Sequence, residues 1–431
     1  MEAPNIHADV HRAIDAVWRI EAPRLIAGLA RIVRDVGAAE DLAQDALVAA
    51  LEKWPRDGIP EKPGAWLMAA AKHRAIDRLR HRSIADRKHE DLGREIDARR
   101  QAAVEDLEDA IDDDIGDDLL RLMFTACHPV LSTEARVALT LRLLGGLTTD
   151  EIARAFLVPE ATVAQRIVRA KKTLAEKEVP FEVPRGTERA SRLGSVLEVL
   201  YLIFNEGYLA TAGEDLTRPG LCEDALRLGR VLAELTPAEP EVHGLVALME
   251  IQASRLRARV GPSGDAVLLA DQTRRLWDRL LVGRGLAALE RAARLPNGRG
   301  PYVLQAEIAA CHARAPAVAD TDWPRIASLY GELARVAPSP VVELNRAVAV
   351  AMAFGPAEGL AVVEPLVDEP SLAAYHLLPA VRADLLAKLG RKDEARAEFE
   401  RAAALTKNAR ERNLLLERAA QAGTARGRDP V

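Results

Sequence analysis

Apolar residues recur at spacings of three and four along almost the whole chain. Segments such as RLIAGLARIV and DLLRLMFTA show this spacing, which places their apolar side chains on one face of a helix. Runs in which Val, Ile and Thr alternate with polar residues are nearly absent, so strands have little support. We therefore predict an all-α protein. Because 431 residues exceed one ordinary hydrophobic core, we expect about two to four domains.

The composition excludes several classes of protein. The chain is 49% hydrophobic and 29% charged, with a net charge of -6, as is usual for soluble globular proteins. Its 3 cysteines, Cys127, Cys222 and Cys311, lie far apart, which disfavours disulfides and a zinc site and suits a reducing cytoplasm. No signal-peptide pattern or membrane-spanning apolar run occurs. We expect a cytoplasmic protein without a metal or cofactor.

Two features divide the chain into parts. Between Glu90 and Asp118, 13 acidic residues accompany three arginines, a net charge of -10, which predicts a solvated linker. Further along, Pro180 and Pro184 interrupt the helical pattern. We predict a first helical domain over 1–88, an acidic linker over 89–118, a second helical domain over 119–180, a helical extension over 181–420 and a flexible tail over 421–431.

Residues 147–174, LTTDEIARAFLVPEATVAQRIVRAKKTL, predict a helix-turn-helix. Thr148 with Glu151 three residues later predicts a capping box, and Pro159 predicts the break between the helices. Leu157 occupies a turn position that often holds glycine. A basic face alone is common on helices, but the cap, turn and helix pair together favour binding in a DNA major groove. Candidate contacts to bases and phosphates are Thr162, Gln165, Arg166, Arg169, Lys171 and Lys172.

Two further patterns lie in the first helical block. In AAEDLAQDAL, residues 38–47, the side chains of Asp41, Gln44 and Asp45 share one helical face. From residue 72 to residue 88, seven Lys or Arg accompany two acids, opposite an apolar face. This pattern predicts a basic amphipathic helix suited to phosphate contacts. Its candidate DNA contacts are Lys72, His73, Arg74, Arg78, Arg80 and Arg82.

These segments resemble a known family. AAEDLAQDAL and GAWLMAAAKHRAIDRLRHR (64–82) resemble the first conserved domain of extracytoplasmic-function (ECF) sigma factors, and the helix-turn-helix resembles their second. The resemblance implies that Asp41, Gln44 and Asp45 bind core RNA polymerase. It implies that the basic helix binds the minus-10 promoter element and the helix-turn-helix the minus-35 element. The loop WPRDGIPEKPGAW would correspond to the family's specificity loop, which captures a flipped base in a pocket of hydrogen-bonding and stacking groups. Its aromatic residues are confined to its ends, at Trp54 and Trp66.

The C-terminal part contains a weak internal repeat. Pro240 precedes Ala247 by seven positions, as Pro340 precedes Ala347. Residues around the second piece are in phase with the tetratricopeptide (TPR) pattern of about 34 residues, and they are Ile326, Tyr330, Leu333, Pro338 and Gly355. Together with YLIFNEGY and SPVVELNRAVAVA, these segments resemble the ECF subgroup with a TPR-like extension. Stacked helix pairs form a concave interaction surface. We expect a regulatory domain and no enzyme activity, with a passive scaffold as the plainer alternative.

The segment YLIFNEGY, residues 201–208, concentrates aromatic residues in a chain that is only 4% aromatic. Three of its side chains share one helical face, which predicts core packing, and Asn205 to Gly207 predicts a helix end at a glycine cap. The segment lies at the start of the extension, so it is also a candidate contact with the DNA-binding part. The candidate residues are Tyr201, Phe204, Asn205, Glu206 and Tyr208.

Three functions remain open at this point. The leading one is an alternative sigma factor that binds core RNA polymerase and promoter DNA, with a regulatory protein or ligand acting at the extension. The main alternative is a helix-turn-helix regulator with a helical sensor domain, which binds duplex DNA without polymerase. A repeat scaffold for protein assembly leaves the basic faces unexplained. The Asp41 face and the basic helix favour the first function, because a plain regulator needs neither.

Overall fold

The computed structural model describes residues 6–86, 115–210, 216–262, 265–296 and 299–424, with the side chains of 6–9, 75–86, 115, 423 and 424 left out. In these ranges the regular structure is helical, apart from one isolated bridge between Val260 and Ala266. The all-α prediction is confirmed. The chain divides into two compact units, a first unit over Met1–Leu200 and a second unit over Tyr201–Val431.

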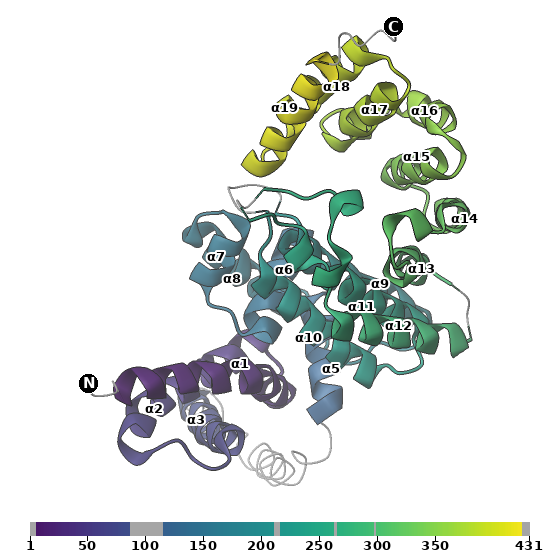
Figure 1. Cartoon of the computed structure of the whole chain (residues 1–431). Helices are drawn as coiled ribbons and strands as arrows, with labels where there is room; N and C mark the ends of the chain where they lie inside the picture. Colours follow the sequence, from purple (N-terminus) through teal and green to yellow (C-terminus); the bar gives the residue numbers. More distant parts are fainter. Residues whose placement is uncertain (1–5, 87–114, 211–215, 263–264, 297–298, 425–431) are drawn as a thin grey trace, which may run out of the picture. The chain divides into compact units, whose positions relative to one another are not determined.

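The first unit contains a helical block on each side of the acidic segment (Figure 1). Asp35 begins the second helix of the first block, since its side chain accepts a hydrogen bond from the backbone N–H of Ala38 at 2.8 Å. The elements are α1 (Ile6–Val33), α2 (Val36–Asp57), α3 (Pro63–Asp86), α5 (Ile115–Ala126), α6 (Thr133–Thr140) with the π-helix η1 (Leu141–Gly145), α7 (Thr149–Phe156), α8 (Glu160–Glu176) and the first part of α9 (Gly186–Tyr208).

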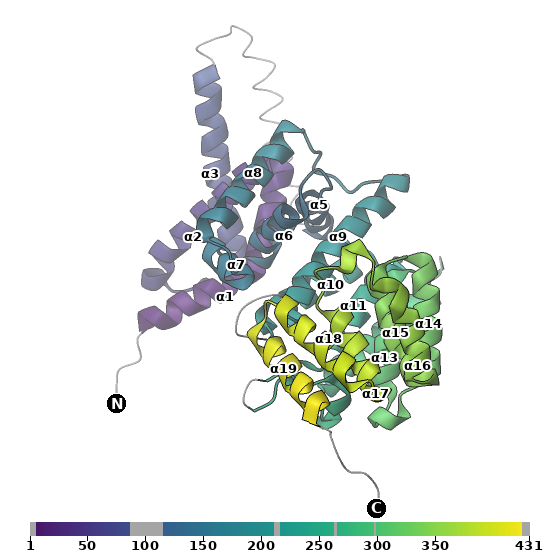
Figure 2. The same ribbon diagram turned by 90° about the horizontal axis from the view of Figure 1, so that it is seen from above.

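α1 is the central helix of the first unit, and it packs against α2, α3 and α5. Figure 2 shows α3 extending past α1 and α2. The side chains of Ile14, Ile26 and Leu29 are at most 2% exposed, as the apolar spacing requires. An ion pair of 3.1 Å between Arg31 Nε and Asp118 Oδ2 ties α1 to α5. The Asp118 side chain is 5% exposed, so this predicted linker residue lies in the folded core.

The second unit is a succession of helix pairs, and Figure 1 shows α13 to α19 following one another in chain order. Proline stands in the first turn of six helices, where its missing N–H leaves no hydrogen bond unmade. The helices are α10 (Pro219–Leu235), α11 (Pro240–Ala253), α12 (Arg279–Arg294), α13 (Pro301–Arg314), α14 (Trp323–Val336), α15 (Pro340–Phe354), α16 (Pro356–Val363), α17 (Leu377–Lys388), α18 (Lys392–Leu405) and α19 (Ala409–Thr424).

The two pieces of the weak repeat coincide with the starts of two helices, α11 and α15. Pro240 and Pro340 begin α11 and α15, and Ala247 and Ala347 are each 0% exposed where neighbouring helices approach. The helix pairs are confirmed, whereas the assignment to the TPR type stays a prediction. At the C-terminal end, α19 continues to Thr424, so the first residues of the predicted flexible tail are helical.

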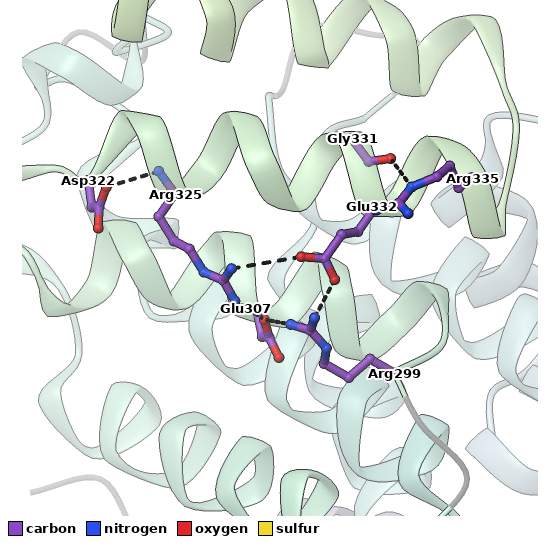
Figure 3. Close-up of polar contacts among 7 residues, drawn as sticks. All are labelled: Arg299, Glu307, Asp322, Arg325, Gly331, Glu332 and Arg335. Atoms are coloured by element: carbon purple, nitrogen blue, oxygen red, sulfur yellow. Dashed lines mark hydrogen bonds and ion pairs between the residues drawn. The ribbon is translucent and has the colours of Figure 1, made fainter.

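Four charged side chains join α13 and α14 on the surface of the second unit (Figure 3). Glu307 of α13 lies 2.6 Å from Arg299 and 3.2 Å from Arg325 of α14. Glu332 of α14 contacts the same two arginines, so the four groups form a closed ring of alternating charge. Because each charge has two opposite neighbours, the ring fixes the two helices better than isolated surface pairs would.

Gly207 does not end a helix, and that prediction was wrong. α9 continues to Tyr208, and Gly207 is buried. A Cβ atom at this position would lie 2.7 Å from the backbone N of Cys222, which is closer than real contacts allow. The glycine is therefore required by the close approach of α10, not by a left-handed cap.

Candidate nucleic-acid interface

The helix-turn-helix is formed by α7 and α8. The Thr148 hydroxyl accepts a hydrogen bond from the N–H of Glu151 at 3.1 Å, and the Glu151 carboxylate accepts one from the N–H of Thr148 at 2.8 Å. The predicted capping box is confirmed. Leu157 ends α7 in the left-handed conformation, with φ of 51° and ψ of 43°. This conformation costs a residue with a Cβ about 1–2 kcal/mol, which explains why glycine is common there.

One face of α8 packs inward, and the opposite face is mostly exposed among the described residues. Val163, Ile167, Ala170 and Leu174 are at most 5% exposed, as predicted. Gln165, Arg169 and Lys172 are exposed on the opposite side, whereas Thr162 and Arg166 are half-buried. Lys172 forms an exposed ion pair of 3.5 Å with Glu176 of its own helix. Five of the six predicted DNA-contact residues therefore retain polar groups at the surface of α8.

Lys171 is the exception, because it is engaged inside the protein. Its ammonium group forms an ion pair with Oε2 of Glu40 on α2, without the alignment of a hydrogen bond. The other oxygen of Glu40 accepts a hydrogen bond of 2.6 Å from Arg142 Nε of η1. The Glu40 side chain is only 5% exposed, so one buried carboxylate ties the first helical block to the helix-turn-helix. The sequence analysis missed Glu40. An acidic residue within the apolar face of α2 was the available indication of a buried ion pair.

The predicted polymerase-binding residues lie on α2. Asp41 is exposed, and Gln44 and Asp45 are half-buried. Asp45 contacts Arg74 of α3 through an ion pair of 3.6 Å, and Arg74 also donates a hydrogen bond to the Asp45 backbone carbonyl. The structure thus brings together two residues that the sequence placed in separate sites. The side chain of Arg74 remains 40% exposed and keeps free donors for a second partner.

The basic helix is α3. Lys72 is half-buried, His73 is exposed, and the apolar face is confirmed where it is described, since Leu67 and Ala71 are at most 1% exposed. The side chains of Arg78, Arg80 and Arg82 lie outside those that the structure describes.

The loop before α3 runs between two tryptophans that belong to the fold. Trp54 is 2% exposed and meets Trp66 edge to face, with ring centroids 5.4 Å apart. Trp54 is therefore a core residue and is not free to stack on a base. The exposed charged residues between the two tryptophans are Arg56, Asp57, Glu61 and Lys62.

The aromatic segment at the end of α9 packs within the second unit. Phe204 is 1% exposed and stacks on Tyr208 at 5.8 Å, so its core prediction is confirmed. The Tyr201 hydroxyl lies 3.2 Å from Gln305 Oε1, to which it donates, and its ring meets Tyr302 edge to face. Glu206 is buried against Arg218, and Asn205 is half-buried. A contact of this segment with the DNA-binding part stays a prediction.

Reactive and metal-binding chemistry has little support in the described ranges. Burial raises the pKa of the Cys127 thiol to about 11 and that of Cys222 to about 12, which keeps both protonated and unreactive. No group of three or more His, Cys, Asp or Glu is placed to hold a metal ion in the parts that the structure covers. None of the helices described is both long and apolar enough to cross a membrane.

Three protein families match successive parts of the chain. Sigma-70 region 2 matches residues 18–84, which include α2 and most of α3. Sigma-70 region 4 matches residues 121–174, which include the helix-turn-helix. A family of unknown function (DUF6596) matches residues 192–293, across the start of the second unit.

Similar proteins fall into two groups. "Uncharacterized protein R00370" of Rhizobium meliloti (strain 1021) is 45% identical over 399 residues, which are 92% of this chain and 93% of that protein. "ECF RNA polymerase sigma factor SigK" of Mycobacterium ulcerans (strain Agy99) is 30% identical over 34% of this chain and 75% of its own length. "ECF RNA polymerase sigma factor SigC" of Mycobacterium tuberculosis (strain CDC 1551 / Oshkosh) is 29% identical over 39% of this chain and 80% of its own length.

Proposed function

Because the chain belongs to the ECF sigma-factor family, we propose that it binds core RNA polymerase and directs transcription from specific promoters, under control of its C-terminal extension. The order of the two sigma-70 regions carries this proposal. Region 2 coincides with the α2 face and the basic helix, and region 4 coincides with the helix-turn-helix. A plain DNA-binding regulator needs only the second of these.

Each region supplies a distinct contact surface. Asp41, Gln44 and Asp45 on α2 form the polymerase-binding surface, and Asp41 is its most exposed member. Lys72, His73 and Arg74 begin the minus-10 surface, which continues along α3 to Arg78, Arg80 and Arg82. Arg74 sits where the two surfaces meet, since it already contacts Asp45. It is therefore placed to couple polymerase contact with DNA contact.

The exposed face of α8 reads the minus-35 element. Arg166 and Arg169 are the candidates for base contacts, because a guanidinium can donate two hydrogen bonds to one guanine. Thr162 and Gln165 lie nearer the N-terminal end of α8, which is the end that usually meets the bases in this motif. Lys172 contacts phosphate. Lys171 can do so only after it leaves Glu40, so we propose that this ion pair breaks when promoter DNA binds.

The extension acts as a regulator that is permanently attached to the DNA-binding part. A tethered domain works at high effective concentration, so weak contacts are enough to change activity. The similarity to protein R00370 covers 92% of this chain, so it spans both the part matched by the sigma-70 regions and the extension. We propose that a regulatory protein or ligand acts on this extension in the cytoplasm.

The contacts of α9 define the best truncation point for removing the extension. The first half of α9 packs in the first unit, because Ser195 Oγ donates to the Cys127 carbonyl at 2.6 Å and Arg192 to the Phe124 carbonyl at 3.1 Å. A truncation at residue 180 would remove these contacts, whereas the two units divide after Leu200. The informative variant therefore ends at Leu200.

The test compares full-length protein with this truncation in promoter-specific transcription by core polymerase. Altered activity of the truncated protein, with its helical content retained, supports regulation by the extension. Equal promoter activity and an equal response to inducing conditions would leave the extension as a passive scaffold. Duplex binding by the full-length protein with no effect on polymerase would instead favour the helix-turn-helix regulator.

A further inference from the structure

The second unit contains a cavity of about 330 Å³ that the proposed function does not use. It lies between the end of α9, the end of α11, residues 266–272 and the start of α19. Its volume is at the lower end of the range for small-molecule sites. Apolar side chains form much of its wall, and the polar members are Tyr208, Gln252, Arg255, Arg259, Gln272 and Glu411.

Arg255 and Arg259 place two guanidinium groups around the ring of Tyr208. Arg255 is only 8% exposed, and its NH2 group donates to the Tyr208 hydroxyl at 2.8 Å. Its guanidinium also lies 5.6 Å from the ring centre of Trp277. Arg259 lies over the Tyr208 ring at 3.9 Å. The aromatic rings hold both guanidinium groups in fixed positions but do not neutralise their charge.

Neither arginine is paired with an acid in the described part of the chain. The Nε atoms of both Arg255 and Arg259 are buried without a hydrogen-bond partner, and no carboxylate lies within ion-pair distance of either group among the described residues. A buried charge without a partner is costly, so a bound anion at this place would offset that cost.

The one described acid on the cavity wall is already engaged. The Glu411 carboxylate accepts a hydrogen bond of 2.9 Å from Thr406 Oγ1 and lies 3.3 Å from His376 Nε2. It also lowers the positive potential near Arg259, which disfavours large polyanions at that side. Arg274, by contrast, is a structural residue, because it donates to the carbonyls of His312 and Ala315.

Two amide side chains complete the polar wall. Gln272 is 6% exposed, and its Nε2 donates to the Val267 carbonyl at 3.2 Å while its Oε1 has no partner. Gln252 Oε1 is likewise buried without a partner. The NH2 group of Gln272 has a second N–H that can meet an anion beside its bond to Val267, and a half-turn of the Gln252 amide would present its NH2 group in place of Oε1.

We propose that this cavity binds a small oxyanion with two negative charges, of the kind that a phosphomonoester carries. The two guanidinium groups supply two positive charges against the single carboxylate of Glu411, and their planar N–H groups suit phosphate oxygens better than an ammonium would. The neutral donors of Tyr208, Gln252 and Gln272 complete the shell. The site lies wholly in the second unit and within the part matched by the family of unknown function, except for Glu411 and Leu414 on α19.

Inorganic phosphate is the probe for this site, added to purified full-length protein without polymerase or DNA. Thermal unfolding and isothermal titration calorimetry are measured in phosphate and in sodium chloride of equal ionic strength. We expect saturable binding at millimolar phosphate with a rise in the midpoint of unfolding, since a ligand that binds only the folded state stabilises it. Chloride gives no saturable shift.

Matched variants locate the binding. Arg259→Gln should weaken phosphate binding by about tenfold or more, because it removes one of the two charges. Arg257→Gln is the control, since Arg257 lies two residues away and is exposed, and it should bind as the original protein does. Arg255→Lys keeps the charge but loses the planar donor group, and it should also bind more weakly.

Two results would overturn the proposal. One is the absence of saturable phosphate binding up to tens of millimolar. The other is equal binding by the Arg259→Gln and Arg257→Gln variants, which would mean that general surface charge is responsible. If circular dichroism shows that Arg255→Lys does not fold, the comparison of Arg259→Gln with Arg257→Gln still tests the proposal. Promoter activity plays no part in this test, so its outcome is separate from that of the proposed function.

Discussion

The buried carboxylate of Glu40 is a sensitive point in the first unit, and the change Glu40→Gln tests it. The substitution preserves size and one acceptor but removes the negative charge between Arg142 and Lys171. The side chains of both cations are 20% exposed. Lys171 can turn toward water at little cost, whereas the Arg142 guanidinium keeps only a neutral acceptor and the Leu147 carbonyl at 3.2 Å.

These contacts set the expected magnitude. A hydrogen bond to a charged partner contributes about 1.5–3 kcal/mol, and loss of one member of a buried pair costs about 3–5 kcal/mol. Since glutamine retains one hydrogen bond, we expect Glu40→Gln to lower the free energy of unfolding by about 2–3 kcal/mol. The loss should persist at high salt, because buried pairs are screened weakly.

Urea unfolding of the full-length protein, followed by tryptophan fluorescence and circular dichroism, measures this change. Asp150→Asn is the matched control, because the Asp150–Arg154 pair has side chains 51% and 70% exposed. It should cost less than about 0.5 kcal/mol. Equal effects of the two substitutions would refute the argument that Glu40 joins the two helical blocks.

Three other changes have defined outcomes. In promoter-binding assays, Arg166→Ala or Arg169→Ala should cost about 1–3 kcal/mol of binding free energy and relax specificity at one base pair. Lys172→Ala should instead weaken binding to all DNA sequences alike. Identical behaviour of these variants would contradict the assigned roles. Leu157→Gly should raise the unfolding free energy by about 1 kcal/mol in urea titrations, because φ is 51° there. Burial, with the charges of Arg255 and Arg274, lowers the pKa of His312 from 6.5 to about 4. Between these pH values only the unfolded chain gains the proton, so stability should fall as pH drops, by up to about 3 kcal/mol, and His312→Gln should flatten this slope.

Local chemistry was predictable from the sequence. The capping box of Thr148 and Glu151 involves residues three positions apart, and the apolar face of α8 follows directly from helical spacing. The all-α class follows from the same periodicity. The error at Gly207 arose because glycine occurs both at left-handed helix caps and where two helices approach closely. The sequence alone does not distinguish these two uses.

Long-range contacts were not predictable in the same way. Glu40 and Lys171 are 131 positions apart in the sequence, and no local pattern in either segment predicts their ion pair. Likewise, Arg255 and Arg259 look like ordinary charged residues until Tyr208 is placed beside them. The sequence analysis found no partner residues for YLIFNEGY, because those partners come from distant segments, such as Gln305 of α13 and Arg255 after α11.

Promoter-dependent transcription with purified core RNA polymerase tests the central claim most directly. Full-length protein should bind the core enzyme and produce promoter-specific transcripts, and Asp41→Ala, on the exposed α2 face, should weaken core binding while leaving duplex DNA binding unchanged. Duplex binding without any transcript, and with no effect of Asp41→Ala on polymerase binding, would contradict the account.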